Sequence, residues 1–245
     1  QGLSILAAQR FGSGDRAGLR PILSTFLVVL LPLAVLCAAL GVWASGSLLH
    51  LLHTPENILA FAGDYLRIIF IGVPFLAAYN LYSALLRAMG DSRAPFYAVV
   101  VSSLANVALD LWFVAGLGMG TAGAALATTA AQAVSFGMAL VLVARRTGLL
   151  QPKLSFFRMH GALLRLILRL GIPSALQMTI AGFSWLVVTF LVNQYGVNVS
   201  AGNGVAIKIK DICQLFISAM ASGATTMIAQ NLGASKFERA KDVMY

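Results

Sequence analysis

Six stretches of the 245-residue chain are apolar over about 20 residues each, the length that a helix needs to cross the hydrocarbon core of a bilayer. Lipid offers no hydrogen bonds to the backbone, so stretches of this kind predict transmembrane helices. We therefore expect an all-α, polytopic membrane protein with spans at about Ile22–Ala44, Tyr65–Leu86, Pro95–Ala115, Thr121–Ala144, Leu170–Gln194 and Ile207–Ala229.

The charged residues support six spans independently. Only 10% of the residues are charged, against about 25% in soluble domains, and the net charge is +9. All of the 17 Lys and Arg residues except Arg67, Lys208 and Lys210 lie in every second connection, which predicts that these connections are cytoplasmic. The positive charge is thus explained by topology in a cell membrane (plasma or inner), and we expect no nucleic-acid partner. Cys37 and Cys213 lie in apolar stretches and indicate neither disulfides nor a metal site.

Cysteine labelling tests this topology. In the full-length protein, a cysteine at Ser155, between the fourth and fifth spans, should react only from the cytoplasm. A cysteine at Ser200, in the next connection, should react only from outside. Reaction of both from one face would contradict the six-span topology.

The two ends of the chain resemble each other. Ala8-Gln9-Arg10-Phe11-Gly12-Ser13 aligns with Ala229-Gln230-Asn231-Leu232-Gly233-Ala234, and Asp15-Arg16-Ala17 aligns with Glu238-Arg239-Ala240 after a two-residue slip. Six spans separate the copies, so both copies lie on the same membrane face. The pattern predicts two parallel six-helix lobes, as in many secondary transporters. We expect residues 1–150 to form a first lobe without its first helix and most of its second, and residues 151–245 to form the inter-lobe loop and the first two helices of the second lobe.

Four motifs resemble one known family. They are Leu85-Leu86-Arg87-Ala88-Met89-Gly90-Asp91-Ser92-Arg93-Ala94-Pro95, Asn106-Val107-Ala108-Leu109-Asp110, Gly120-Thr121-Ala122-Gly123-Ala124-Ala125-Leu126-Ala127-Thr128 and Ala229-Gln230-Asn231-Leu232-Gly233-Ala234. In order and spacing they are similar to the fourth to eighth helices of MATE (multidrug and toxic-compound extrusion) transporters. The resemblance implies a fragment of a twelve-helix, two-lobe transporter that covers its third to eighth helices.

Asp110 is the most informative residue, because an acid inside a span costs about 2.5–3.5 kcal/mol unless it is partnered or hydrated. Asn106 lies one helical turn earlier on the same face. The resemblance implies that Asn106, Asp110, Thr128 and the Ala124 carbonyl contribute to a site for a coupling Na⁺ or H⁺, completed by an acid on the family's first helix. The alternative is a purely structural role, in which Asp110 and Asn106 only form hydrogen bonds between helices. We expect no other metal and no cofactor.

Several other polar side chains are candidates for ligand contacts. Lys208, Lys210 and Asp211, at the expected start of the last span, either contact an acidic lipid or substrate or form a solvated helix end. A second set either lines a drug cavity or simply packs: Tyr79, Asn80, Tyr82, Gln132 and Met138.

The leading functional hypothesis is a secondary antiporter that exports organic, often cationic, compounds in exchange for Na⁺ or H⁺, monomeric as the full-length protein. The first alternative is a flippase for lipid-linked oligosaccharides from the same superfamily, which would line its cavity with basic residues. A membrane-embedded enzyme would need a convergent catalytic set at span depth. Only Asp110 lies that deep, so we expect no enzymatic activity.

Overall fold

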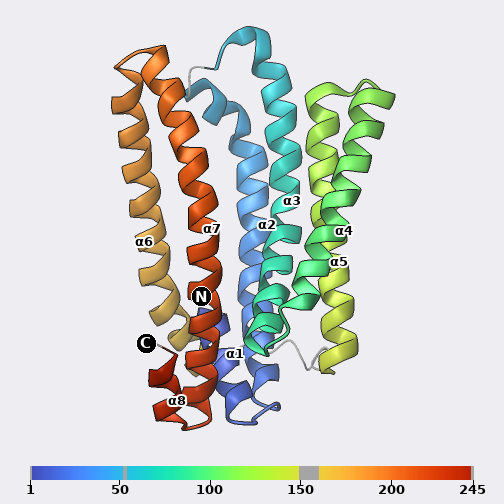
Figure 1. The fold of residues 1–245 in the computed structure, drawn as a ribbon. Coiled ribbons are helices and arrows are strands. Elements are labelled where there is room, and N and C mark those ends of the chain that lie inside the picture. Colours follow the sequence, from blue (N-terminus) through green and yellow to red (C-terminus); the bar gives the residue numbers. More distant parts are fainter. Residues whose placement is uncertain (1, 52–53, 149–159, 244–245) are drawn as a thin grey trace. The chain divides into compact units, whose positions relative to one another are not determined.

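The computed structural model describes residues 2–51, 54–148 and 160–243, and the described chain is almost entirely helical (Figure 1). Six of the described helical segments are long and apolar enough to cross a membrane, which confirms the six expected spans. The elements are α1 (Gly2–Gly12), α2 (Leu19–Leu51), α3 (Glu56–Ala88), α4 (Arg93–Asp110), the π-helix η1 (Leu111–Gly116), α5 (Gly120–Thr147), α6 (Gly161–Asn193), α7 (Val197–Gly233) and α8 (Phe237–Asp242).

The helices extend beyond the stretches expected from hydropathy. Helix α3 begins at Glu56 rather than near Tyr65, and α7 begins at Val197 rather than near Ile207. Backbone hydrogen bonding continues beyond the apolar stretches, into residues where hydropathy no longer indicates a span. Pro32, Pro74 and Pro173 lie inside α2, α3 and α6, so none of them ends its helix.

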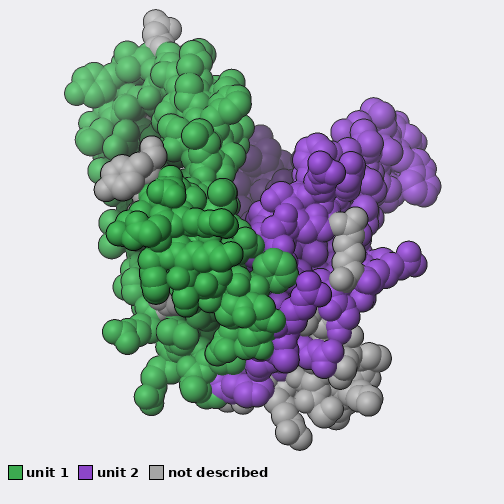
Figure 2. Space-filling view, turned by 60° about the horizontal axis from the view of Figure 1, so that its bottom comes forward, with its two compact units in different colours: residues 1–15, 161–245 green, residues 16–160 purple. Residues whose placement is uncertain are grey.

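The described helices form two compact units (Figure 2), one of residues 16–160 and the other of residues 1–15 and 161–245. We call them the α2–α5 unit and the α1/α6–α8 unit. Helix α1 thus clusters with α6–α8, although it precedes α2 in the chain. The division into lobes at residue 150 stays a prediction.

In the α2–α5 unit, α3 packs against both α2 and α5, and α4 packs against α5. Close contacts depend on glycine at two places: a Cβ on Gly41 would overlap the Phe70 ring, and one on Gly72 would overlap the side-chain oxygen of Gln132. The Phe136 ring lies 6.1 Å from the Tyr82 ring, centroid to centroid, so aromatic packing fills the next part of the α3–α5 interface.

The turn between α3 and α4 explains the motif around Gly90-Asp91. Gly90 has φ +85°, which suits glycine, and the Asp91 amide donates to the Leu86 carbonyl, which ends α3. The Asp91 carboxylate then accepts a hydrogen bond from the Ala94 amide (3.0 Å) and caps the first turn of α4. The motif therefore sets where α4 begins and so where its later residues lie.

In the α1/α6–α8 unit, α1 packs chiefly against the C-terminal end of α7. The membrane-spanning part of α6 has no buried residue within the described structure, and that of α7 has very few. Large apolar side chains such as Met178, Phe183 and Met220 are exposed, as expected for surfaces that contact lipid or other helices.

Candidate functional site

Asp110 is the last residue of α4 and is directly followed by the π-helix η1. It lies within the continuous apolar span Arg93–Gly116 and is partly exposed. Among the described residues, its carboxylate forms no hydrogen bond and no ion pair. A carboxylate within a span and without a protein partner is costly, and this is typical of a site that binds an ion or a proton.

Asn106 lies one turn before Asp110 on α4, so the two side chains share a helix face. Its side-chain amide nitrogen is buried and has no hydrogen-bond partner in the described structure. Leaving such a donor unpaired costs about 1–3 kcal/mol. The amide therefore needs an acceptor that the described residues do not provide, such as a carboxylate or a water molecule.

Thr128 and Ala124 lie one turn apart near the start of α5. The Thr128 hydroxyl donates to the Ala124 carbonyl (2.9 Å), so the two predicted oxygen ligands are adjacent. Thr128 is partly exposed, and its hydroxyl oxygen retains lone pairs for another partner. The structure thus brings Ala124 and Thr128 together on α5, but no hydrogen bond joins them to Asp110 or Asn106 in the parts described. The assignment of these four residues to one cation site stays a prediction.

Gly123 sets the approach of α5 to η1. A Cβ on Gly123 would lie 3.2 Å from the backbone carbonyl carbon of Phe113 and 2.9 Å from the Cβ of Met119. Contacts of this kind are tighter than nearly all real Cβ contacts, so a larger residue at this position would push η1 and Met119 away by a few tenths of an ångström. Small residues at the start of α5 therefore let it pack closely against η1, less than two turns before Thr128.

Replacing Gly123 with alanine should therefore move η1 away from α5. In the full-length protein we expect Gly123→Ala to lower thermal stability by about 1–3 kcal/mol, the usual cost of overpacking. Gly137→Ala is the matched control, because Gly137 lies on the same helix with open space at its Cβ position. Thermal unfolding in detergent checks both variants, and equal melting curves would show that the Gly123 contact is not tight.

The residues predicted to line a substrate cavity have different environments. Tyr82 is 4% exposed, with its ring against Phe136, and the Tyr79 hydroxyl donates to the Pro95 carbonyl (3.5 Å). Asn80 is exposed and donates to its own helix at the Leu76 carbonyl (2.9 Å). Both tyrosines therefore take part in packing within the α2–α5 unit, and whether they also contact a substrate stays a prediction.

Gln132 and Met138 lie further along α5. The side-chain oxygen of Gln132 is buried beside Gly72 and has no hydrogen-bond partner among the described residues. The neighbouring Thr129 hydroxyl donates to the Ile68 carbonyl (3.1 Å), so this part of the α3–α5 interface is polar. Met138 is partly buried. A role for either residue in a substrate cavity stays a prediction.

Lys208, Lys210 and Asp211 lie inside α7, not at its start as expected, because α7 begins at Val197. The Lys210 ammonium lies 4.5 Å from the centroid of the Trp185 ring on α6 and 3.2 Å from the Asp211 carboxylate. These contacts satisfy much of the Lys210 charge locally.

Sequence reasoning missed one feature next to the candidate site, the π-helix after Asp110. A π-helix has no clear sequence signature, although it occurs often at functional sites. A signal for a tight connection was present in the glycine-rich run Gly116-Leu117-Gly118-Met119-Gly120. In the structure, Gly118 and Gly120 have positive φ values.

Comparison with known sequences assigns the family. The MatE family matches residues 1–112 and 173–245. The chain is 32% identical over 250 residues to YoeA of Bacillus subtilis (strain 168), named a probable multidrug resistance protein, and 34% identical over 239 residues to YpnP of the same organism, named likewise. These alignments cover 99% and 97% of this chain but only 54% and 53% of the relatives. The chain thus spans about half the length of the curated relatives that it matches.

Solved structures agree on the fold. A MATE transporter in its bent conformation matches 99% of the chain with a TM-score of 0.87 at 24% identity, and the chain covers 55% of that structure. An outward-facing multidrug resistance MATE transporter of the MOP superfamily matches with a TM-score of 0.80 at 26% identity. This match also covers 99% of the present chain, and it covers 54% of the transporter's chain. The relatives are transporters rather than enzymes. The chain is therefore a multi-pass membrane protein that belongs to the MATE family and has the fold of about half of a MATE structure.

Proposed function

We propose that the full-length protein is an ion-coupled antiporter that exports organic, often cationic, compounds. Relatives named as multidrug resistance and multidrug export proteins support this proposal, among them YoeA of Bacillus subtilis (strain 168) and MepA of Staphylococcus aureus (strain NCTC 8325 / PS 47). The observation that carries the proposal is the Asp110 carboxylate, which lies within a span and has no ion-pair partner among the described residues.

Such a carboxylate couples two cations through competition. A bound Na⁺ or a proton neutralises Asp110, and an organic cation then loses its electrostatic partner in the same cavity. The Thr128 hydroxyl and the Ala124 carbonyl are neutral oxygens, which suit a hard cation such as Na⁺. The unpaired Asn106 amide suits an acceptor in the same site, such as the acid on the family's first helix. Binding of the coupling ion from outside would then release the organic compound outward.

A lipid-linked oligosaccharide flippase is the second candidate. The position of Lys208 within α7 favours it, because an exposed lysine in a span suits a phosphorylated substrate. In a solved MOP superfamily transporter from Pyrococcus furiosus, 25% identical to this chain, the reverse polarity of the binding pocket suggests a different function. Against the flippase, Lys210 is engaged with Trp185 and Asp211.

Reconstituted transport separates the two candidates. The full-length protein in vesicles should move a fluorescent organic cation against its gradient when a sodium or proton gradient is imposed, and an ionophore that collapses the coupling gradient should stop it. Thr128→Ala should raise the required sodium concentration severalfold if sodium is the coupling ion. If the vesicles move a labelled lipid-linked oligosaccharide and export no organic cation, the antiporter proposal is wrong and the flippase proposal takes its place.

A further inference from the structure

Helices α1 and α7 make a reciprocal backbone contact in their last turns. A Cβ on Gly12 would overlap the backbone carbonyl of Gln230, and a Cβ on Gly233 would overlap the backbone carbonyl of Gln9. The adjacent Ala8 is fully buried, so small residues line the rest of the contact. We call this contact, formed by residues 8–12 and 229–233, the glycine crossing. No side chain larger than hydrogen fits at its two central positions.

The two halves of the glycine crossing also end in the same way. After α1, the amides of Ser13, Gly14 and Asp15 donate to the carbonyls of Gln9, Phe11 and Arg10 (3.0, 3.1 and 3.0 Å). After α7, the amides of Ala234, Ser235 and Lys236 donate to the carbonyls of Gln230, Leu232 and Asn231 (3.0, 3.1 and 2.9 Å). Gly14 and Ser235 both have positive φ, 77° and 58°. The repeat seen in the sequence is therefore also a repeat in backbone structure.

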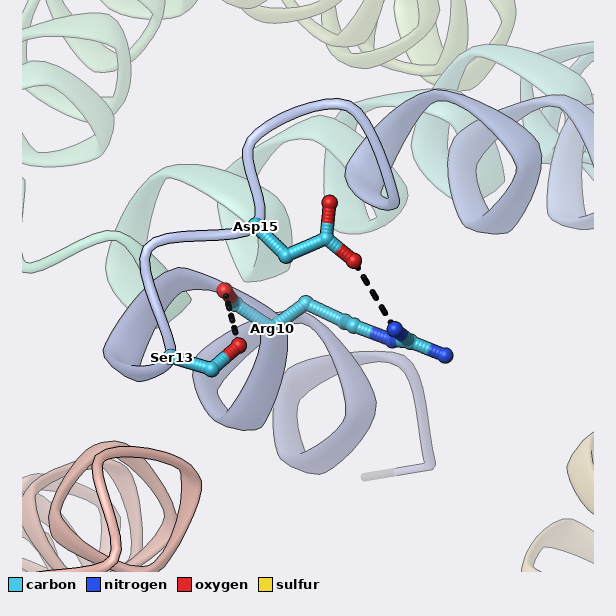
Figure 3. A network of polar contacts seen from close by, with 3 residues as sticks. All are labelled: Arg10, Ser13 and Asp15. Carbon is cyan, nitrogen blue, oxygen red and sulfur yellow. Dashed lines mark hydrogen bonds and ion pairs between the residues drawn. The ribbon is translucent and has the colours of Figure 1, made fainter.

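Side chains around the glycine crossing differ between the copies. After α1, Arg10 pairs with Asp15 (2.8 Å) and the Ser13 hydroxyl donates to the Arg10 carbonyl (2.9 Å), as Figure 3 shows. The position that corresponds to Arg10 holds Asn231 in the second copy. The two copies share the close contact of one helix backbone with the other, at Gly12 and at Gly233. A functional explanation must therefore account for this contact rather than for the side chains around it.

We propose that the glycine crossing is a clasp that joins the two repeats at the predicted cytoplasmic face in one state of the transport cycle and separates in the other. This inference rests on the proposed function, because export by alternating access requires the helix ends at each face to separate in turn. The contact lies in the last turn of both helices, where any tilting of one repeat against the other produces a large displacement.

The composition of the clasp suits a contact that opens. Glycine and alanine bury little apolar area, so separating them costs less than separating large side chains. Their small size nevertheless lets two backbones meet and exclude water while they are in contact. A shallow hollow lined by Gln9, Arg10, Ser13, Leu232 and Gly233 borders the clasp, so polar side chains already lie at its edge.

Cross-linking tests the clasp directly. In a full-length protein whose native cysteines are replaced, Ser13→Cys and Leu232→Cys place two thiols on that one hollow. A short, reducible bifunctional thiol reagent should join them, stop at least nine-tenths of substrate export, and release the inhibition on reduction. A monofunctional reagent on the same thiols is the control and should inhibit export severalfold less than the bifunctional reagent, because it cannot join α1 to α7. Export that continues in the cross-linked protein would show that α1 and α7 do not separate, and would overturn the proposal.

Alanine variants test the role of the two glycines. Gly12→Ala and Gly233→Ala should each slow cross-linking at least tenfold, whereas Gly223→Ala on α7, which has open space at its Cβ position, should not. Cross-linking at the parent rate in both variants would overturn the close contact. If the parent protein exports no tested compound, the proposed function alone fails. The clasp is then tested by comparing the rate of cross-linking under an inward sodium or proton gradient with the rate under an outward one. We expect the two rates to differ, and equal rates would overturn the clasp.

Discussion

Asp110→Asn in the full-length protein should reduce ion-driven export to the rate of protein-free vesicles. Asparagine keeps the size of aspartate but removes the charge for which, in the proposed antiport, the organic cation and the coupling ion compete. Asp110 forms no ion pair among the described residues, so its removal leaves no buried positive charge behind in that part of the chain. The variant should therefore still insert and fold. Transport in reconstituted vesicles, with protein amount checked by gel filtration, measures the effect.

Asp64→Asn is the matched control for this prediction. Asp64 lies on α3 with its side chain 61% exposed and 3.6 Å from Arg67, and an exposed pair of this kind contributes at most about 1 kcal/mol. We expect export at the parent rate from this variant. If Asp110→Asn also exports at the parent rate with unchanged ion dependence, then Asp110 only packs against neighbouring helices and the cation site is wrongly assigned.

Gly41→Leu should be strongly destabilising. Even a Cβ at this position of α2 would overlap the Phe70 ring on α3, so a leucine forces the two helices apart. Overpacking by a few methylenes costs about 1–3 kcal/mol and occasionally more, and here the neighbour is a rigid ring. We expect a large drop in the thermal unfolding temperature of the full-length protein in detergent.

Two further variants check the cause. Gly46→Leu, also on α2 but with open space at its Cβ position, should unfold close to the parent temperature. Adding Phe70→Ala to Gly41→Leu should restore part of the lost stability, since it removes the ring that the leucine meets. A Gly41→Leu protein as stable as the parent would contradict the α2–α3 contact.

The spans could be predicted from sequence because length and apolarity alone determine whether a helix can cross a bilayer. The helix ends could not, since α3 and α7 continue beyond the apolar stretches into residues where hydropathy gives no signal. That error placed Lys210 at a helix start instead of inside α7, over Trp185. The local sequence around Lys210 therefore does not reveal that this residue lies inside a helix and against a tryptophan of the preceding helix.

The candidate site was predicted only in part. The spacing of Asn106 and Asp110 follows from helical periodicity, so their shared face was predictable. The hydrogen bond from Thr128 to the Ala124 carbonyl is also local, as expected for a threonine in a helix. The approach of α5 to η1 at Gly123 is different, because it depends on which helices become neighbours. Sequence periodicity describes faces of single helices but not the distances between them.

The π-helix after Asp110 makes the orientation of this span sensitive to the number of residues in a single turn. At the end of η1 the Leu117 amide donates to the Trp112 carbonyl (2.9 Å), five residues earlier, so this turn holds one residue more than an α-helical turn. Deleting one residue from η1 would allow α-helical hydrogen bonding to continue, and would rotate the end of the span by about 100° relative to α4. The acid-bearing face would then change its phase relative to α5 although no side chain of the site had been altered. A one-residue insertion or deletion in this turn would thus reorient the face that carries Asp110 without substituting any of the four residues of the predicted cation site.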